Sequence, residues 1–386
     1  MSQSDKRKVC VVVASRANYG RIKTVLKEID KHPDLELQLI VGASALLYRF
    51  GQVVDVITQD GFEVTARLYS IVEGENLTTM AKSTGLGIIE LATIFENLKP
   101  DVVLTVADRF ETMATAITAS YMNIPVAHTQ GGEVTGSIDE SVRHAITKLS
   151  HIHFVATDKS RERVIKMGEE PAHVFNTGCP AIDAISSIDL SLPEDLFTRY
   201  GGVGSPIDTA KPYIVVLQHP VTTEYGSGLA QINETLAAIK MLNMQTIWLW
   251  PNVDAGSDDI SKGLRVFREK NPGVPLHLFR NFAVEDYARL INNCVCLIGN
   301  SSSGIREGAF LGVPVVNIGT RQQHRERANN VLDTQYNRES ILNAIQSQLK
   351  HGRYPSVPLF GDGNSGKKIA ELLATEELTI QKAITY

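Results

Sequence analysis

The sequence predicts an α/β protein with two Rossmann-like, doubly wound domains and a central cleft, and three observations support this prediction. The chain has 386 residues, more than one ordinary hydrophobic core holds. Short apolar, β-rich runs alternate with helical patterns along most of its length. Nearly every such run ends in polar or glycine-rich residues, as expected where parallel strands present a ligand site at their carboxyl ends.

The first domain is expected over residues 1–185. It opens with the run VCVVVA at 9–14, which is continuous and therefore typical of a strand covered on both faces. The stretch 20–30 follows, with apolar residues at helical spacing. A second helix is expected at 111–122, and further strands at 37–41, 101–106, 124–127, 152–156 and 174–176.

Residues 186–212 break this alternation, because three prolines and three glycines fall within them. We interpret them as the connection between the domains, with room for one short helix. The second domain is expected over 213–363, and 364–386 holds a helix that can pack back on the first domain. In the second domain we expect strands at 213–217, 246–250, 276–278, 295–298 and 313–318, and helices at 229–241, 258–270, 284–292 and 305–311.

Composition excludes several classes of function. The net charge is −5 and no long basic run is present, which argues against a nucleic-acid partner. The four cysteines are scattered, which suits a reducing compartment, and their spacing predicts no metal site. The N-terminus is polar and the apolar run after it is short, so we expect a cytoplasmic protein without a membrane partner. No P-loop or dinucleotide-binding signature supports a kinase or a dehydrogenase.

The segment GNSSSGIRE at 299–307 joins a strand directly to a helix in the second domain. Glycines let the backbone turn closely, and the first N–H groups of a helix favour an anion. Ser301 and Ser302 can donate to the same phosphate, whereas Glu307 better accepts from a ribose diol. The competing interpretation is a serine N-cap in a glycine turn.

Arg16, His219 and Arg321 also follow predicted strands. The two arginines lie in different domains, and each can clamp a diphosphate because a guanidinium fork matches phosphate oxygens. The alternative for each arginine is a surface ion pair. His219 precedes a proline, which would pin it in the cleft, and its alternative is a capping or packing role.

The carboxylates gather in the first domain. Asp108 follows the strand at 101–106, and the segment 128–144 brings Glu133, Asp139 and Glu140 together with histidines and glycines. Such a segment can place an acid and a base around a sugar ring. For Asp108 taken by itself, a helix N-cap is the simpler interpretation.

An ordered set of motifs carries a family resemblance over nearly the whole chain. SRANYG, DRFET, HTQGGEVTGSIDESVRHAITKLSHIH, LQHPVTTE, PNVDAGS, GNSSSGIRE and NIGTRQ occur in this order. They resemble the hydrolysing UDP-N-acetylglucosamine 2-epimerases of sialic-acid biosynthesis and their relatives that act on UDP-N,N′-diacetylbacillosamine in legionaminic-acid biosynthesis. The resemblance implies a GT-B architecture, a UDP-sugar substrate, no metal or other cofactor, and a homodimer or homotetramer.

The resemblance also assigns roles to residues. It implies nucleotide contacts by Arg16, Arg109, His219, Asn252, Ser301, Ser302, Glu307 and Arg321, and catalytic acids at Asp108 and Asp139. Gln130 departs from the family pattern, which often has a catalytic glutamate there, so Asp108, Asp139 or Glu133 is expected to act as the base. Gly20 replaces a small hydroxyl residue, so a backbone contact is expected in place of a side-chain contact.

The implied reaction expels UDP from C1 as C2 loses a proton, and water then adds to the resulting glycal. Three alternatives stay open: a non-hydrolysing 2-epimerase, a GT-B glycosyltransferase that needs an acceptor, and a nucleotide-sugar sensor without turnover. The sequence does not distinguish a 4-hydroxyl sugar from a 4-acetamido, 6-deoxy sugar.

Overall fold

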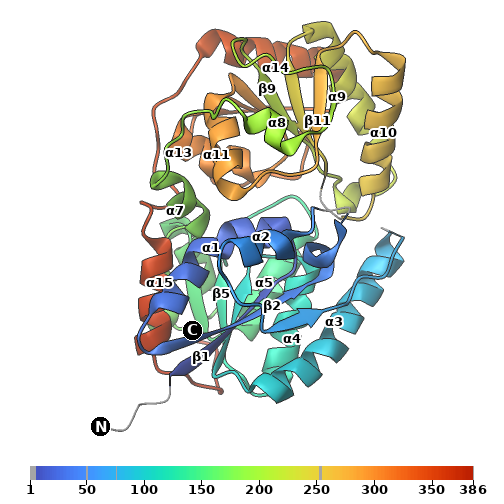
Figure 1. Ribbon diagram of the computed structural model, residues 1–386. Helices are drawn as coiled ribbons and strands as arrows, with labels where there is room; N and C mark the ends of the chain where they lie inside the picture. The colour runs from blue at the N-terminus through green and yellow to red at the C-terminus, as the bar shows by residue number, and fades with distance from the viewer. Residues whose placement is uncertain (1–5, 49–50, 75, 252–253, 386) are drawn as a thin grey trace. The chain divides into compact units, whose positions relative to one another are not determined.

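The protein divides into two compact units, and a computed structural model describes residues 6–48, 51–74, 76–251 and 254–385. Unit 1 contains the chain up to Glu133, Asp139–Ser187, and Phe360 to the C-terminus. Unit 2 contains Val134–Ile138 and Ile188–Leu359. Each unit is built on one seven-stranded sheet with helices on both faces (Figure 1).

The sheet of unit 1 is parallel throughout, with strand order β3-β2-β1-β4-β5-β6-β7. The order reverses between β1 and β4, so the carboxyl ends of these two strands flank the topological switch point where α/β proteins bind ligands. The strands are β1 (Arg7–Val13), β2 (Leu35–Gly42), β3 (Ala66–Leu68), β4 (Val102–Val106), β5 (Val126–Thr129), β6 (Ile152–Val155) and β7 (Val174–Asn176).

Strand β1 shows why a continuous apolar run is needed. Val9 and Val11 pack with Ile22 on one face, while Cys10 and Val12 pack with Phe95 on the other. Both faces are therefore covered, as the uninterrupted run predicts. The helices of unit 1 are α1 (Arg16–Lys31), α2 (Val53–Gln59), α3 (Leu77–Leu98), α4 (Phe110–Tyr121), α5 (Asp139–Leu149), α6 (Asp158–Lys166), α7 (Pro180–Ser186) and α15 (Ser365–Thr375).

The end of the chain is part of unit 1. Helix α15 packs against α1, where Gly366 lets the two backbones approach closely beside Thr24. The carboxylate of Asp183 on α7 accepts from the first N–H groups of α15, at 3.0 Å from Ser365 N and 2.6 Å from Gly366 N. Beyond the helix, Lys382 binds the buried carboxylate of Glu169 at 2.6 Å.

Unit 2 repeats the plan with one antiparallel edge strand. Its strand order is β14-β13-β12-β9-β10-β11-β8, with the switch point between β9 and β12. The strands are β8 (Val203–Gly204, antiparallel to β11), β9 (Ile214–Leu217), β10 (Thr246–Leu249), β11 (Leu276–Phe279), β12 (Cys296–Gly299), β13 (Val315–Ile318) and β14 (Val331–Thr334). The helices are α8 (Leu196–Tyr200), α9 (Gly228–Leu242), α10 (Ser257–Lys270), α11 (Val284–Asn293), α12 (Ser302–Ile305), α13 (Glu307–Leu311) and α14 (Arg338–His351).

The predicted α/β fold with two Rossmann-like sheets is confirmed, and every predicted strand is present to within a few residues. The predicted helix at 305–311 is wrong in one respect. The helix is divided at the buried Arg306, where α12 ends and α13 begins, although Arg306 keeps right-handed helical dihedrals (φ −88°, ψ −69°). Helices α2, α3, α6, α7 and α14 and the short strands β3, β8 and β14 were not predicted.

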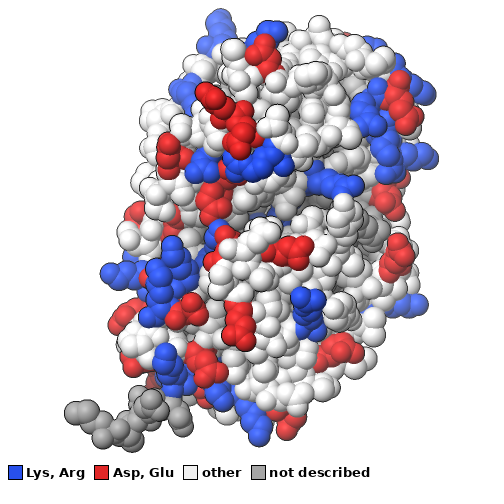
Figure 2. Space-filling model, in the orientation of Figure 1, with Lys and Arg blue, Asp and Glu red and all other residues white. Residues whose placement is uncertain are grey.

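The described surface is mixed in charge. On the face drawn in Figure 2, Lys and Arg side chains are interspersed with Asp and Glu. Among the described helices, none is both long and apolar enough to cross a membrane.

Candidate active site

The switch point of unit 1 is tied together by Asn18. Its Oδ1 accepts from the N–H of Ala14, at the end of β1, over 3.2 Å. Its Nδ2 donates to the carbonyl of Val106, the last residue of β4, over 3.3 Å. Ser15 caps α1 by accepting from the N–H of Asn18. The ends of the two strands that flank the switch point are therefore fixed by one buried amide.

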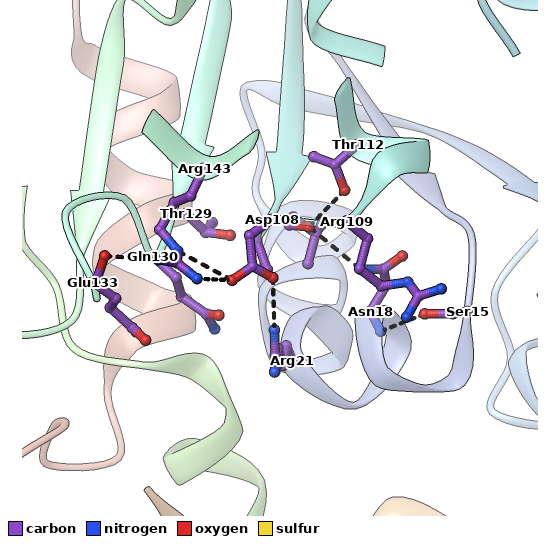
Figure 3. A network of polar contacts seen from close by, with 12 residues as sticks. Ser15, Asn18, Arg21, Asp108, Arg109, Thr112, Thr129, Gln130, Glu133 and Arg143 are labelled. Carbon is purple, nitrogen blue, oxygen red and sulfur yellow. Dashed lines mark hydrogen bonds and ion pairs between the residues drawn. The ribbon is translucent and has the colours of Figure 1, made fainter. Parts of the chain in front are cut away.

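Asp108 leaves β4 through a strained turn and meets two arginines. Ala107 has φ +61°, a left-handed conformation that is uncommon outside glycine. The carboxylate of Asp108 accepts from Nε of Arg143 at 3.1 Å and from its Nη2, and Arg21 lies 3.8 Å away on the other side (Figure 3). The N-cap position of α4 is Arg109, so the N-cap interpretation of Asp108 is wrong.

Arg143 is the central cation of this site. It is completely buried on α5, and its Nη1 donates to the carbonyl of Glu133 at 2.7 Å and to the carboxylate of Glu140 at 2.9 Å. Burial by itself would lower the pKa of Arg143, but the nearby carboxylates, Asp108 foremost, raise it. One guanidinium thus joins the turn after β4 to the segment after β5.

Gln130 and Glu133 line the same corner from the loop after β5. Gln130 has φ +63° and is only 1% exposed. Its Nε2 donates to the sulfur of Cys179 at 3.3 Å, and its Oε1 is buried without a hydrogen-bond partner among the described residues. Glu133 is buried as well. Asp139 is half-buried at the first residue of α5, one turn before Arg143.

The predicted nucleotide contacts of unit 1 have different surroundings. Arg109 is buried in a two-point ion pair with Glu111, with Nε–Oε2 at 3.1 Å and Nη2–Oε1 at 3.2 Å. Arg16 is the first residue of α1 and is half-buried. Gly20 lies inside α1, where the helix ladder engages its backbone polar groups. Whether the backbone of Gly20 contacts the substrate stays a prediction.

In unit 2, the corresponding connection is made by Asn300, at the end of β12. Its Oδ1 accepts from the N–H of His219 at 2.7 Å, and its Nδ2 donates to the carbonyl of His219 at 2.9 Å. Gly299 just before it has φ +125°, and a Cβ there would collide with the carbonyl of Leu217. The ends of β9 and β12 are thus held as tightly as those of β1 and β4.

The serine segment follows Asn300. Ser301 caps α12 by accepting from the N–H of Ser303 at 3.3 Å, and the hydroxyl of Ser303 lies 2.6 Å from that of Tyr287. Ser302 is the first residue of α12, which has only four residues. Because so short a helix contributes little macrodipole, an anion here would depend on individual N–H and hydroxyl groups. Both the N-cap and the turn that sequence suggested are present.

Arg321 and Glu307 complete this end of unit 2. Nη1 of Arg321 donates to the carbonyl of Asn300 at 3.2 Å, which brings the guanidinium to the serine segment. The neighbouring Gln322 donates to the same carbonyl at 2.9 Å. Glu307 is half-buried at the first residue of α13. Asn252, also predicted to contact the nucleotide, lies outside the described residues.

The structure thus gathers Asp108, Gln130 and Glu133 in unit 1, and His219, Ser301 and Arg321 in unit 2. Sequence analysis gave no role to four residues that organise them, namely Asn18, Arg21, Arg143 and Asn300. Arg143 carried a signal, since it lies on the buried stripe of α5 with Ile146 and Thr147, where a charged residue is unusual. Within the described part of the chain, no three His, Cys, Asp or Glu side chains are grouped to hold a metal ion.

Comparison with known proteins identifies the family to which the chain is similar. A sequence model described as UDP-N-acetylglucosamine 2-epimerase matches residues 27–374. The chain is 35% identical to the UDP-N,N′-diacetylbacillosamine 2-epimerase (hydrolyzing) of Legionella pneumophila, over 97% of each chain. It is 33% identical to the GDP/UDP-N,N′-diacetylbacillosamine 2-epimerase (hydrolyzing) of Campylobacter jejuni, over 86% of this chain and 85% of that protein.

A solved structure shows the same fold. The UDP-GlcNAc 2-epimerase of Neisseria meningitidis, bound to UDP-GlcNAc, superposes with a TM-score of 0.79 at 20% identity. The match covers 96% of this chain and 100% of that chain.

Proposed function

The chain belongs to the UDP-N-acetylglucosamine 2-epimerase family, and we propose that it is a hydrolysing member. It would convert a UDP-activated 2-acetamido sugar into UDP and the free 2-epimer, within nonulosonic-acid biosynthesis. The observation that carries the proposal is Asp108, a buried carboxylate fixed by Arg143 at the switch point of unit 1. The two curated relatives described above, whose names specify hydrolysis, support the hydrolysing type.

The first stage is an elimination. A base takes the C2 proton while the C1–oxygen bond to the diphosphate breaks, which leaves a 2-acetamidoglycal and UDP. A C2 proton beside an acetal is barely acidic, and it becomes removable only as C1 gains positive character. The protein must therefore supply a fixed base near C2 and stabilise the charge that develops on the diphosphate.

The second stage adds water across the double bond. Hydroxide adds to C1 and a proton to C2, on the face opposite to the one that lost its proton. One water is consumed for each UDP released, and C2 takes its new hydrogen from solvent. The free sugar is N-acetylmannosamine for a UDP-N-acetylglucosamine substrate, and the 2,4-diacetamido-2,4,6-trideoxymannose analogue for a diacetylbacillosamine substrate.

Unit 1 would supply the bond-breaking groups. Asp108 is the proposed base, because two arginines hold its carboxylate in one orientation. Glu133 and Asp139 are left for protonation in the second stage, and both lie on the segment joined to Arg143. Gln130 cannot take a proton at neutral pH, but the free Oε1 of this buried residue can accept from a sugar hydroxyl or amide.

Unit 2 would hold the nucleotide. The hydroxyl groups of Ser301 and Ser302 and the guanidinium of Arg321 are donors that suit a diphosphate. Arg16 and Arg109 of unit 1 are proposed as further phosphate contacts, and His219 as a contact to the nucleotide. Glu307 is an acceptor and suits the ribose diol rather than phosphate.

The test is an assay in deuterium oxide with UDP-N-acetylglucosamine and UDP-N,N′-diacetylbacillosamine side by side, followed by phosphorus and proton NMR. We expect UDP and a free 2-epimerised sugar from at least one substrate, with deuterium at C2. Asp108→Asn is the matched control, because it removes the base and keeps the shape of the side chain.

The two enzymatic alternatives give different outcomes in this assay, and a sensor would give no turnover. An epimerised UDP-sugar without free sugar would identify a non-hydrolysing epimerase. Turnover that starts only on addition of an acceptor would identify a glycosyltransferase. Comparing the two rates would decide which sugar the protein uses.

A further inference from the structure

One histidine joins three parts of the candidate site without taking part in any role proposed above. His128 lies on β5 and is completely buried. Its Nε2 is 3.0 Å from the carbonyl oxygen of Ala107, the residue before Asp108. Its Nδ1 is 3.3 Å from the hydroxyl of Thr147 on α5. The imidazole thus connects the end of β5, the turn after β4 and the helix that begins with Asp139.

The partners of His128 define its protonation. A carbonyl oxygen can only accept, so Nε2 carries the proton and Nδ1 is bare. The single hydroxyl hydrogen of Thr147 is shared between Nδ1 at 3.3 Å and the carbonyl oxygen of Arg143 at 3.1 Å. Burial lowers the pKa of His128 to about 3, even though the carbonyl of Ala107 and the charge of Asp108 raise it. The ring is therefore neutral near pH 7, with one fixed tautomer.

The bond to Ala107 falls on a strained residue. The left-handed backbone of Ala107 is disfavoured for a side chain with a Cβ, and it persists only where the surroundings hold it. This turn sends Asp108 toward Arg143 and leaves the N-cap position of α4 to Arg109. The N–H of His128 holds the carbonyl of the residue on which the turn depends.

The loop after β5 rests on the same ring. A Cβ built on Gly131 would lie 3.2 Å from Nδ1 of His128 and 3.1 Å from Oγ1 of Thr147. The backbone between Gln130 and Glu133 thus packs directly against the imidazole. Replacing the ring should therefore disturb both the turn that carries Asp108 and the loop that carries Glu133.

We propose that His128 is a positioning residue of the reaction: it holds the turn at Ala107 in place and so keeps the carboxylate of Asp108 beside Arg143 of α5. The proposal rests on the proposed function, because it takes Asp108 to be the base at C2. Because the side chain of His128 is completely buried, its proposed effect passes through the Ala107 turn to Asp108 and needs no contact with the substrate.

The first test compares His128→Leu with His128→Gln, since the glutamine amide can place an N–H donor near the position of Nε2. We expect His128→Leu to lower kcat by about 10- to 100-fold, the size of effect that a small misplacement of a catalytic group produces. KM and the affinity for UDP should stay close to wild type, and His128→Gln should recover most of the loss.

His153→Leu is the matched control. His153 is the cross-strand partner of His128 on β6 and is equally buried, but its Nε2 binds Glu169 at 3.1 Å instead of the Ala107 turn. It should cost stability in urea unfolding and leave kcat near wild type. An equal fall in kcat for His153→Leu and His128→Leu would overturn the proposal, because it would reduce His128 to a core residue.

The second test adds Ala107→Gly to His128→Leu. Glycine adopts the left-handed conformation without strain, so the turn should hold again and kcat should rise toward wild type. No recovery in the double variant, together with a glutamine variant as poor as the leucine variant, would overturn the proposal.

A third measurement needs no substrate. Nitrogen-15 NMR of the folded wild type should show His128 neutral with the proton on Nε2 between about pH 5 and 8. A proton on Nδ1 would overturn the proposed hydrogen bond to Ala107. Failure of the proposed function is distinguishable, because wild type would then release no UDP from either UDP-sugar, and the catalytic role of His128 would fall with it.

Discussion

The carboxyl ends of the two sheets have the same topology and opposite chemistry. In unit 1, the switch point holds a buried carboxylate, Asp108, between two guanidinium groups. In unit 2, the corresponding point holds Asn300 with amides, hydroxyls, backbone groups and the guanidinium of Arg321 around it, and among the described residues no buried carboxylate is hydrogen-bonded to Asn300. Both are held across the switch point by one asparagine, Asn18 in unit 1 and Asn300 in unit 2.

The two kinds of site differ in the desolvation penalty that their polar groups impose on folding. A buried charge loses its hydration, so Asp108 is tolerated only because Arg143 is buried beside it with further acceptors of its own. Neutral donors carry no such penalty and can stay at a strand end while no ligand is bound. We therefore expect changes in unit 1 to affect kcat and stability, and changes in unit 2 to affect nucleotide affinity.

The largest expected effect on turnover comes from removing the charge of Asp108. Asp108→Asn should lower kcat by about 10²- to 10⁴-fold, the usual contribution of a general base. UDP affinity, measured by isothermal titration calorimetry, should not change. A variant that turns over at the wild-type rate would show that Asp108 is not the base, and Glu133 or Asp139 would take its place.

Removing the partner cation tests how far unit 1 depends on it. Arg143→Met leaves the carboxylates of Asp108 and Glu140 without their buried partner, so the free energy of unfolding should fall by about 3–5 kcal/mol. Urea unfolding followed by circular dichroism gives this value. Lys27→Met on the exposed side of α1 is the control, with an expected change below about 0.5 kcal/mol. An equal, small change in both variants would contradict the comparison.

The two units should differ in their stability toward acid. Burial lowers the pKa of His128 to about 3 and also lowers that of His153. Below about pH 6.5 these histidines are protonated in the unfolded chain but stay neutral in folded unit 1. The free energy of unfolding therefore falls as pH falls, by up to about 1.4 kcal/mol per pH unit for each such group. The pKa of Glu169 is also lowered by His153 and two lysines, to about 2, so its contribution is present above about pH 4.5 and is lost as pH falls toward 2.

Two optical signals distinguish the units in this titration. Both tryptophans, Trp248 and Trp250, belong to unit 2, so tryptophan fluorescence follows that unit, while circular dichroism follows both. We expect the circular dichroism signal to change at a higher pH than the fluorescence. Coincident transitions would mean that the buried histidines do not set the acid limit of unit 1.

The smallest effects are expected in unit 2. Arg321→Ala should weaken UDP binding by about 10- to 100-fold, and Ser302→Ala by about 3- to 10-fold, as expected for a charged and a neutral hydrogen bond. With saturating substrate, kcat should stay near wild type for both. A fall in kcat without a change in UDP affinity would move these residues from holding the nucleotide to the chemistry.

Sequence alone predicted the central strands of both sheets and their polar ends, because parallel strands buried on both faces need uninterrupted apolar runs. It missed α3, whose sequence mixes glycines and threonines with apolar residues, and β14, which is partly exposed and only four residues long. The break at Arg306 was invisible, since it depends on burial of a charged side chain.

The candidate site was predictable to a similar degree. The topology rule places Asp108 and Ser301 at strand ends, but it does not say which cation a carboxylate meets. Arg21 and Arg143 lie on helices far from Asp108 in the sequence, and only the packing of α1 and α5 brings them to it. The role of Ala107 depends on a backbone angle that its residue type does not reveal.

The return of residues 360–386 to unit 1 has a consequence for how the chain is made. Ile369 and Leu373 of α15 belong to the same buried cluster as Ile22 and Leu26 of α1. The ribosome must first translate the roughly 170 residues of unit 2, which takes about 10 to 30 seconds at 5–20 residues per second. During that interval α1 exposes an apolar face, and unit 2 has its full sequence before α15 is made. Unit 1 therefore emerges first from the ribosome and completes its fold last. Its apolar face is the one that we expect a nascent-chain chaperone to bind.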